Sequence, residues 1–183
     1  MKKCLFLLCI SLSSLAQSSI LGKRVTSKID SSKSPEIVLI QEFSVNAPLK
    51  SVWDAYTTKK GYESWAAPLA EIDLKVGGYI KSNYNESGEI GDTTTILTHI
   101  VNYVPLKILT LQAELTDNFP EFMKKEAQDF YNVIYFDQNP DGMTTVKSYG
   151  IGYKNTPKYL SLMNYFIPAN EKILLNLISI LEK

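Results

Sequence analysis

Apolar residues change their spacing along the chain, and each spacing predicts a different element. Residues 36–45 are rich in β-branched and apolar side chains, which predicts a first strand. The next apolar residues lie on one face of a short helix, at Leu49, Val52, Trp53 and Tyr56. A second short helical turn is expected over 61–65. Two short helices therefore follow the first strand.

After these helices the period changes to two. Ile72, Leu74 and Val76 alternate with charged residues, which indicates a half-buried strand. Further strands separated by short turns are expected over 79–84, 93–104, 108–115, 130–136 and 143–153, with a helical insertion over 121–128. Such short turns permit only antiparallel neighbours, because parallel pairing needs a long crossover.

The longest helix is expected at the C-terminus. Thr156 and Pro157 suit its N-cap and first turn, and its apolar face continues to Leu181. Pro168 should kink or break this helix, with Asn170 able to cap the second part. The expected fold is α+β with a helix-grip arrangement: a curved antiparallel sheet of about seven strands with the long helix across its concave face.

The N-terminal residues have the pattern of an export signal. A basic start is followed by an apolar run too short to span a bilayer and by Ala16, which suits cleavage. A buried N-terminal helix is the alternative. Residues 1–16 are thus predicted to be a signal peptide, 17–35 a flexible Ser-rich leader and 36–183 the folded domain. An edge strand over 20–25 is the other possibility for the leader.

Composition narrows the function. The chain has 19 Lys and Arg against 19 Asp and Glu, and cleavage near Ala16 would remove Lys2 and Lys3. The mature chain would then carry more acidic than basic residues, which argues against a nucleic-acid partner. Cys4 and Cys9 would leave with the signal peptide, and His99 is the single histidine, so no metal site or other cofactor is expected. The prediction is an exported protein, periplasmic or secreted, without stable membrane insertion; its oligomeric state is open.

Several segments carry a resemblance to a known family. They are Val45–Pro48, Val52–Ala55, Trp65, Ile72–Gly78 and Leu162–Glu171. Taken in this order they resemble the START-like superfamily (SRPBCC), in the branch related to the activator of the heat-shock-protein ATPase (AHSA-like). The resemblance covers the chain from Glu36 to its end. An exported chain would not meet the cytosolic chaperone of that branch's namesake.

The resemblance implies a cavity between the sheet and the terminal helix, used in that superfamily for apolar ligands. The ligand-binding residues expected from the family pattern are Trp65, Ile80, Tyr84, Met163, Phe166 and Ile167. The favoured hypothesis is a noncatalytic binder of an apolar or amphipathic small molecule. One alternative is a cyclase or dehydratase that uses His99 or a cavity tyrosine. The other is a protein-interaction module whose cavity is filled by its own side chains.

Overall fold

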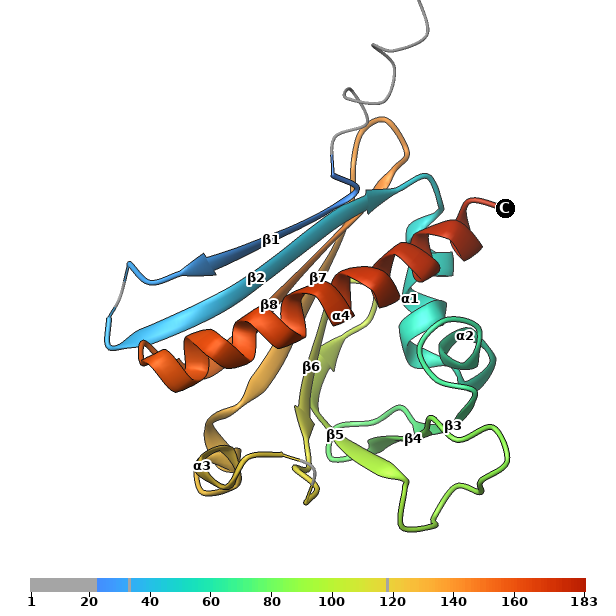
Figure 1. Ribbon diagram of the computed structural model, residues 1–183. Helices are drawn as coiled ribbons and strands as arrows, with labels where there is room; N and C mark the ends of the chain where they lie inside the picture. The colour runs from blue at the N-terminus through green and yellow to red at the C-terminus, as the bar shows by residue number, and fades with distance from the viewer. Residues whose placement is uncertain (1–22, 33, 118) are drawn as a thin grey trace, which may run out of the picture.

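A computed structural model describes residues 23–32, 34–117 and 119–183 (Figure 1). Its sheet has eight strands in the order β1-β2-β8-β7-β6-β5-β4-β3, and every neighbouring pair is antiparallel. The strands are β1 (Val25–Asp30), β2 (Glu36–Val45), β3 (Leu69–Asp73), β4 (Tyr79–Asn83), β5 (Ile96–Val104), β6 (Ile108–Ala113), β7 (Tyr131–Gln138) and β8 (Thr144–Lys154). The expected α+β class and antiparallel order are confirmed.

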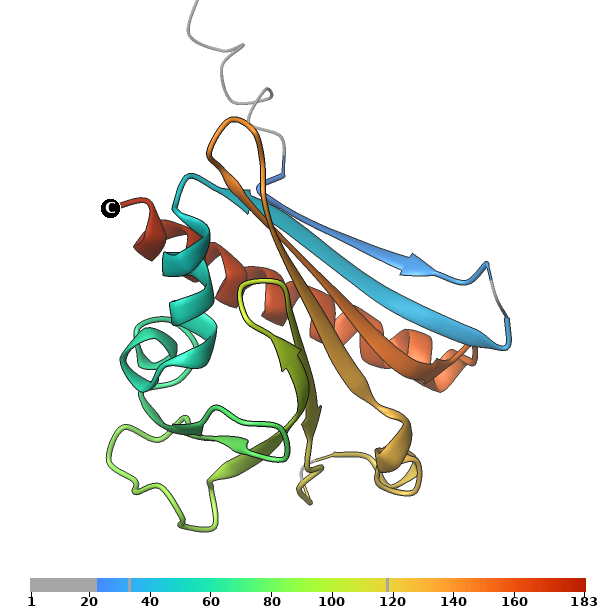
Figure 2. The same cartoon turned by 180° about the vertical axis from the view of Figure 1, so that it is seen from behind.

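The helices also follow the expected order. They are α1 (Leu49–Thr57), α2 (Lys59–Glu63), α3 (Glu121–Lys124), the short 3-10 helix η1 (Ala127–Asp129) and α4 (Pro157–Leu181). The sheet curves around α4, which crosses its concave side, while α1 and α2 cover one end (Figures 1 and 2). The helix-grip arrangement is therefore confirmed, and α3 with η1 forms the predicted insertion.

The predicted leader is wrong where the structure describes it. Residues 25–30 form an edge strand that pairs with β2 from Val25 and Phe43 to Asp30 and Val38. Val25 is 1% exposed and belongs to the core. One buried face is enough for an edge strand, so a Ser- and Lys-rich segment can still form one. The predicted signal peptide and the beginning of the leader lie outside the described residues.

The expected break at Pro168 does not occur. α4 runs through Pro168 as one helix, so Asn170 lies inside it instead of capping a second helix. A proline removes one backbone donor from a helix, and packing along the rest of α4 holds the element together.

β8 contains a bulge where it passes the insertion that carries α3 and η1. Ile37 pairs with Tyr153 while Leu39 pairs with Gly150, so β8 has one more residue than β2 across this interval. Gly152 has a positive φ of 91°, and a Cβ there would lie 1.9 Å from the backbone oxygen of Asp129. Only glycine fits so close to η1. The bulge therefore depends on glycine at position 152.

Candidate functional site

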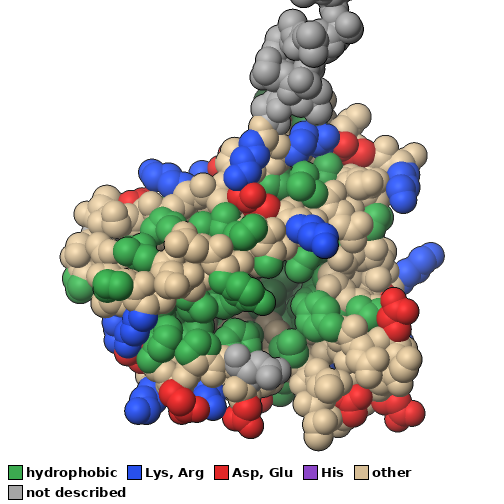
Figure 3. All heavy atoms as spheres, viewed as in Figure 1, with side chains coloured by type: hydrophobic (Ala, Val, Ile, Leu, Met, Phe, Trp, Pro, Cys, Tyr) green, Lys and Arg blue, Asp and Glu red, His purple; other side chains and the backbone are tan. Residues whose placement is uncertain are grey.

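The concave side of the sheet is not completely filled by α4. Three adjoining hollows of about 390, 180 and 130 Å³ lie between the sheet and the helices. Their opening is visible below α4, with hydrophobic side chains around it (Figure 3). The largest lies within the size range of small-molecule sites, about 300 to 1,000 Å³. This side of the sheet is the candidate site.

Apolar side chains make up most of the wall of the largest hollow. They come from β5, β6 and the insertion that carries α3, and they are Ile96, Leu111, Ala113, Leu115, Phe119, Met123 and Phe130. Ser82 and Thr98 add hydroxyl groups on the strand side. A wall of this kind favours an apolar ligand body, because burial of its surface is the main source of affinity.

Aromatic rings line the second hollow, next to α1 and α2. The ring centroids of Tyr56 and Trp65 lie 4.9 Å apart, and those of Tyr62 and Trp65 lie 5.8 Å apart. The Trp65 indole Nε1 donates a hydrogen bond to the Ala55 carbonyl over 2.9 Å, which fixes the ring. These rings form a rigid wall with polar tips.

The smallest hollow exists because β8 has a glycine at its floor. Gly150 lies beside Leu39 of β2, and a Cβ at Gly150 would approach the Tyr153 ring to 3.1 Å. The recess is bounded by Gln41 and Ser148 on one side and by Phe166 on the other. A larger residue at position 150 would fill this space.

Two asparagines border all three hollows. Asn132 projects from β7 and Asn170 from α4. The Asn170 Nδ2 donates to the Gln41 Oε1 over 2.9 Å, and the Gln41 Nε2 donates to the Ser27 Oγ of β1 over 3.0 Å. Ser27 in turn donates to the Glu171 carboxylate over 2.7 Å. The junction of the hollows is therefore a neutral carboxamide cluster, consisting of Gln41, Asn132 and Asn170.

No charged side chain lines these hollows, as far as the described residues go. Burial raises the pKa of Tyr56 and of Tyr62, and burial also raises the pKa of Tyr153. These phenols therefore stay protonated near neutral pH, where they act as hydrogen-bond donors and acceptors and not as bases. The described lining of the hollows is therefore neutral near this pH.

His99 lies on the other face of the sheet. Its neighbour Thr98 faces the hollow, so His99 points away from it, and its Nε2 lies 2.8 Å from the Glu114 Oε1 on the surface. The hypothesis of an acid or base at His99 within the cavity is therefore wrong.

The structure brings together only part of the predicted binding set. Trp65, Tyr84 and Phe166 line the hollows. The other three do not: Ile80 is 1% exposed in the larger core cluster, Met163 is fully buried in a second cluster, and Ile167 packs against that second cluster. Periodicity indicates on which face a side chain lies but not whether a neighbour covers it.

The carboxamides were missed, although the sequence contains a signal for two of them. The buried face of β2 reads Ile37, Leu39, Gln41, Phe43 and Val45, so a single amide interrupts an apolar series. A buried polar side chain in such a series needs a partner and is therefore informative. Asn132 gives a similar signal, because it stands between Phe130 and Ile134 on the buried face of β7. Asn170 gives none, because charged residues follow it along the chain.

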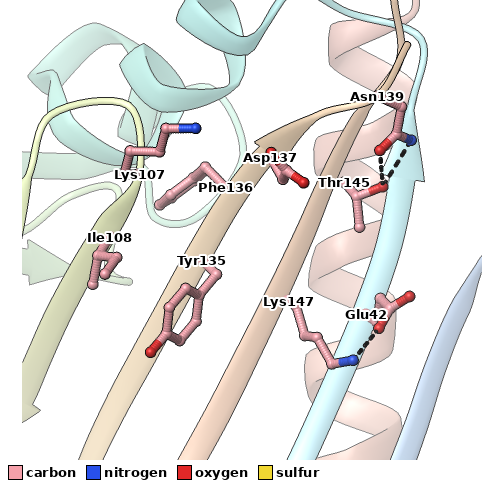
Figure 4. Close-up of a pocket in the computed structure, with 9 residues that line it drawn as sticks. All are labelled: Glu42, Lys107, Ile108, Tyr135, Phe136, Asp137, Asn139, Thr145 and Lys147. Atoms are coloured by element: carbon pink, nitrogen blue, oxygen red, sulfur yellow. Dashed lines mark hydrogen bonds and ion pairs between the residues drawn. The ribbon is translucent and has the colours of Figure 1, made fainter. Parts of the chain in front are cut away.

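A further depression of about 460 Å³ lies on the convex face (Figure 4). Lys147 and Glu42 form an ion pair of 2.8 Å beside it, and Asn139 and Thr145 are hydrogen-bonded above. Tyr135, 44% exposed, lies at its centre. Solvent-exposed charges and a lack of any covering helix make this depression a poorer small-molecule site than the concave side.

Neither a metal centre nor a membrane span is found in the part of the chain that the structure describes. None of its His, Cys, Asp and Glu side chains gather in threes around a possible metal position. None of its helices combines the length and hydropathy that crossing a membrane requires.

The comparisons with known proteins agree with this architecture. Residues 46–164 match the family described as Activator of Hsp90 ATPase homolog 1-like protein. No curated protein matches the chain.

Solved structures show the same fold at low sequence identity. The Aha1 dimer from Colwellia psychrerythraea is 17% identical with a TM-score of 0.59, covering 79% of this chain and 96% of that one. Protein MLL2253 from Mesorhizobium loti is 15% identical with a TM-score of 0.60, covering 78% and 94%. CalU16 from Micromonospora echinospora is 16% identical with a TM-score of 0.58, covering 85% and 86%. On its family match, which spans most of the chain, the protein belongs to the Activator of Hsp90 ATPase homolog 1-like family.

Proposed function

We propose that the protein binds an apolar or amphipathic small molecule between the sheet and α4, outside the cytoplasm, without transforming it. The observation that carries this proposal is the continuous lining of apolar, aromatic and neutral polar side chains on the concave side. Fold alone does not set function, so this lining is the basis of the proposal.

The hollow on the concave side favours a binding protein over an interaction module with a filled cavity. A module with a self-filled cavity would have the packing of a protein interior, which leaves few voids larger than a water molecule. The hollow of about 390 Å³ lies between the sheet and α4, where such a module would place its own side chains. Binding is supported over catalysis because the ionisable groups of the lining are tyrosines, four of them with raised pKa values, while His99 faces away.

Native mass spectrometry of protein recovered from the cells that produce it tests the proposal directly. A retained molecule would add its mass to that of the chain and so reveal its chemical class. A thermal-shift screen with fatty alcohols, sterols and aromatic polyketides complements it, because a ligand at a hundredfold its Kd adds about 2.7 kcal/mol to the folded state. An empty spectrum together with no thermal shift for any of these compounds would contradict the proposal.

The export part of the proposal has its own test. It is supported by the basic start and apolar run of residues 1–16. The recovered chain should begin near Gln17, and an intact Met1 would contradict export without affecting the binding proposal.

A further inference from the structure

We infer that the ligand of this site is uncharged and carries a hydrogen-bonding head group that lies between Asn132 and Asn170, with its apolar body in the largest hollow. The inference rests on the proposed binding function and specifies the chemical class of the ligand. A fatty alcohol or amide fits this description, whereas the matching carboxylate does not.

The head-group position follows from how the hollows meet. Asn132 and Asn170 are the two residues that border the 390, 180 and 130 Å³ hollows alike, so a ligand that reaches from one hollow into another passes these carboxamides. Asn132 projects from β7 and Asn170 from the helix opposite, so the two amides flank the junction. The apolar wall of the largest hollow begins on one side of them.

The cluster has unused hydrogen-bonding capacity. The side chains of Asn132 and Ser148 have no hydrogen-bond partner among the described residues, and neither has the Asn170 Oδ1. The Asn170 Nδ2 and both ends of the Gln41 amide are already engaged. The free groups therefore offer carbonyl acceptors, amide donors and one hydroxyl to a ligand, which suits a head group that both donates and accepts.

The absence of a positive charge from the described lining disfavours a carboxylate head group. The lining contains no Lys, Arg or His among the described residues that could pair with an anion. The nearest carboxylate behind the cluster, Glu171, is reached through Ser27, and it is already paired with Lys23 at 2.7 Å. Asn132 is exposed and Asn170 is half-buried, so an anionic head would give up part of its hydration there. It would gain no counter-charge in return, which makes its binding less favourable than that of a neutral head.

Matched ligands test the inference on the full folded chain. We expect dodecanol and dodecanamide to bind, and dodecanoate to bind at least about tenfold more weakly at about pH 8, as measured by calorimetry. Naphthalenemethanol and naphthoate repeat the comparison for a ring-shaped body. Equal or tighter binding of the carboxylates would overturn the inference and leave the proposed function standing. Failure of every alcohol, amide and carboxylate to bind would overturn both.

A substitution then reverses the preference. Asn132→Lys places a cation at the junction without breaking a hydrogen bond, so dodecanoate should gain about tenfold or more in affinity while dodecanol does not. Tyr135→Lys, on the outer face of the same strand, is the matched control and should leave both affinities unchanged. If both lysine variants gained dodecanoate affinity equally, general surface charge would explain the effect and the inference would be wrong.

Discussion

The two ends of the concave face share one sheet and one helix, yet one end is filled and the other is hollow. At the filled end, Trp53 of α1 meets Phe136 of β7 with ring centroids 5.2 Å apart, and Leu177 of α4 is fully buried beside them. At the hollow end the same strand carries Asn132 and the same helix carries Asn170. The backbone elements continue through both ends, so side-chain size and polarity decide where space remains.

This contrast can be tested first at the filled end. Phe136 is 2% exposed and contacts both Trp53 and Tyr56 through edge-on rings. Phe136→Ala should lower the free energy of unfolding by about 3–5 kcal/mol, the range for aromatic truncation in a core. Urea denaturation measures it, and a loss under about 1 kcal/mol would show that this end is not close-packed.

Met163 sharpens the boundary between the two ends. It was predicted to line the cavity, but it is fully buried in the cluster with Tyr159 and Met123. Met163→Ala should therefore lower the free energy of unfolding by about 2–5 kcal/mol and change ligand affinity little. If stability stayed within about 1 kcal/mol of wild type while binding was lost, Met163 would belong to the hollow after all.

Removal of the edge strand β1 should give the next largest loss of stability. A chain that begins at Ser31 loses the buried Val25 and the Ser27 bond to the carboxamide cluster. Burial of one valine contributes about 1.5–3 kcal/mol, so thermal unfolding should occur at a clearly lower temperature. A chain that begins at Lys23 is the control and should behave like the longer protein. Equal melting of the two chains would show that β1 adds nothing to folding.

Phe166 should behave differently from Phe136, although both are aromatic. It is half-buried and faces two of the hollows, so Phe166→Ala enlarges an existing space. We expect a loss of less than about 2 kcal/mol in unfolding free energy, together with weaker binding of dodecanol. A loss as large as that of Phe136→Ala would remove the distinction between the two ends.

The smallest effect on stability is expected at Gly150. Its added methyl group would approach Tyr153 to 3.1 Å and Leu39 to 3.6 Å, so Tyr153 needs to shift only slightly. Gly150→Ala should change the unfolding free energy by no more than about 1 kcal/mol, since reduced freedom of the unfolded chain offsets the crowding. Titration calorimetry should show weaker binding of ligands that reach the recess; unchanged binding would mean that the recess is unused.

Sequence reasoning reached the architecture because the sheet and helices are set by periods of apolar residues. The helical spacing at Val52 and Trp53 recurs in α1. The alternation at Ile72, Leu74 and Val76 predicted a strand too late in the chain, because β3 ends at Asp73 and Val76 is 67% exposed. β1 was not predicted as a strand, because this edge strand buries little more than Val25 and its sequence shows no clear alternation. The contacts that close or open a hollow join residues distant in sequence, such as Gln41 and Asn170, and no local pattern contains them.

The predicted site residues show the same contrast between local sequence pattern and long-range packing. Trp65, Tyr84 and Phe166 line the hollows, and for them family pattern and face agree with their positions in the structure. Ile80 lies on the concave face but does not line a hollow, because packing of the core covers it completely. Which of two residues on one face is covered depends on α1 and α4 together, and a single strand's sequence does not contain that information.

The two glycines of β8 differ in the substitutions that they can accept during evolution. Gly152 combines a left-handed backbone with no room beside Asp129, so every coding change at this position should be eliminated with the fold itself. Gly150, two residues earlier, borders the recess and has room for a methyl group after a small shift. Single mutations at position 150 should therefore be able to change the shape of the site, whereas position 152 should accept only glycine.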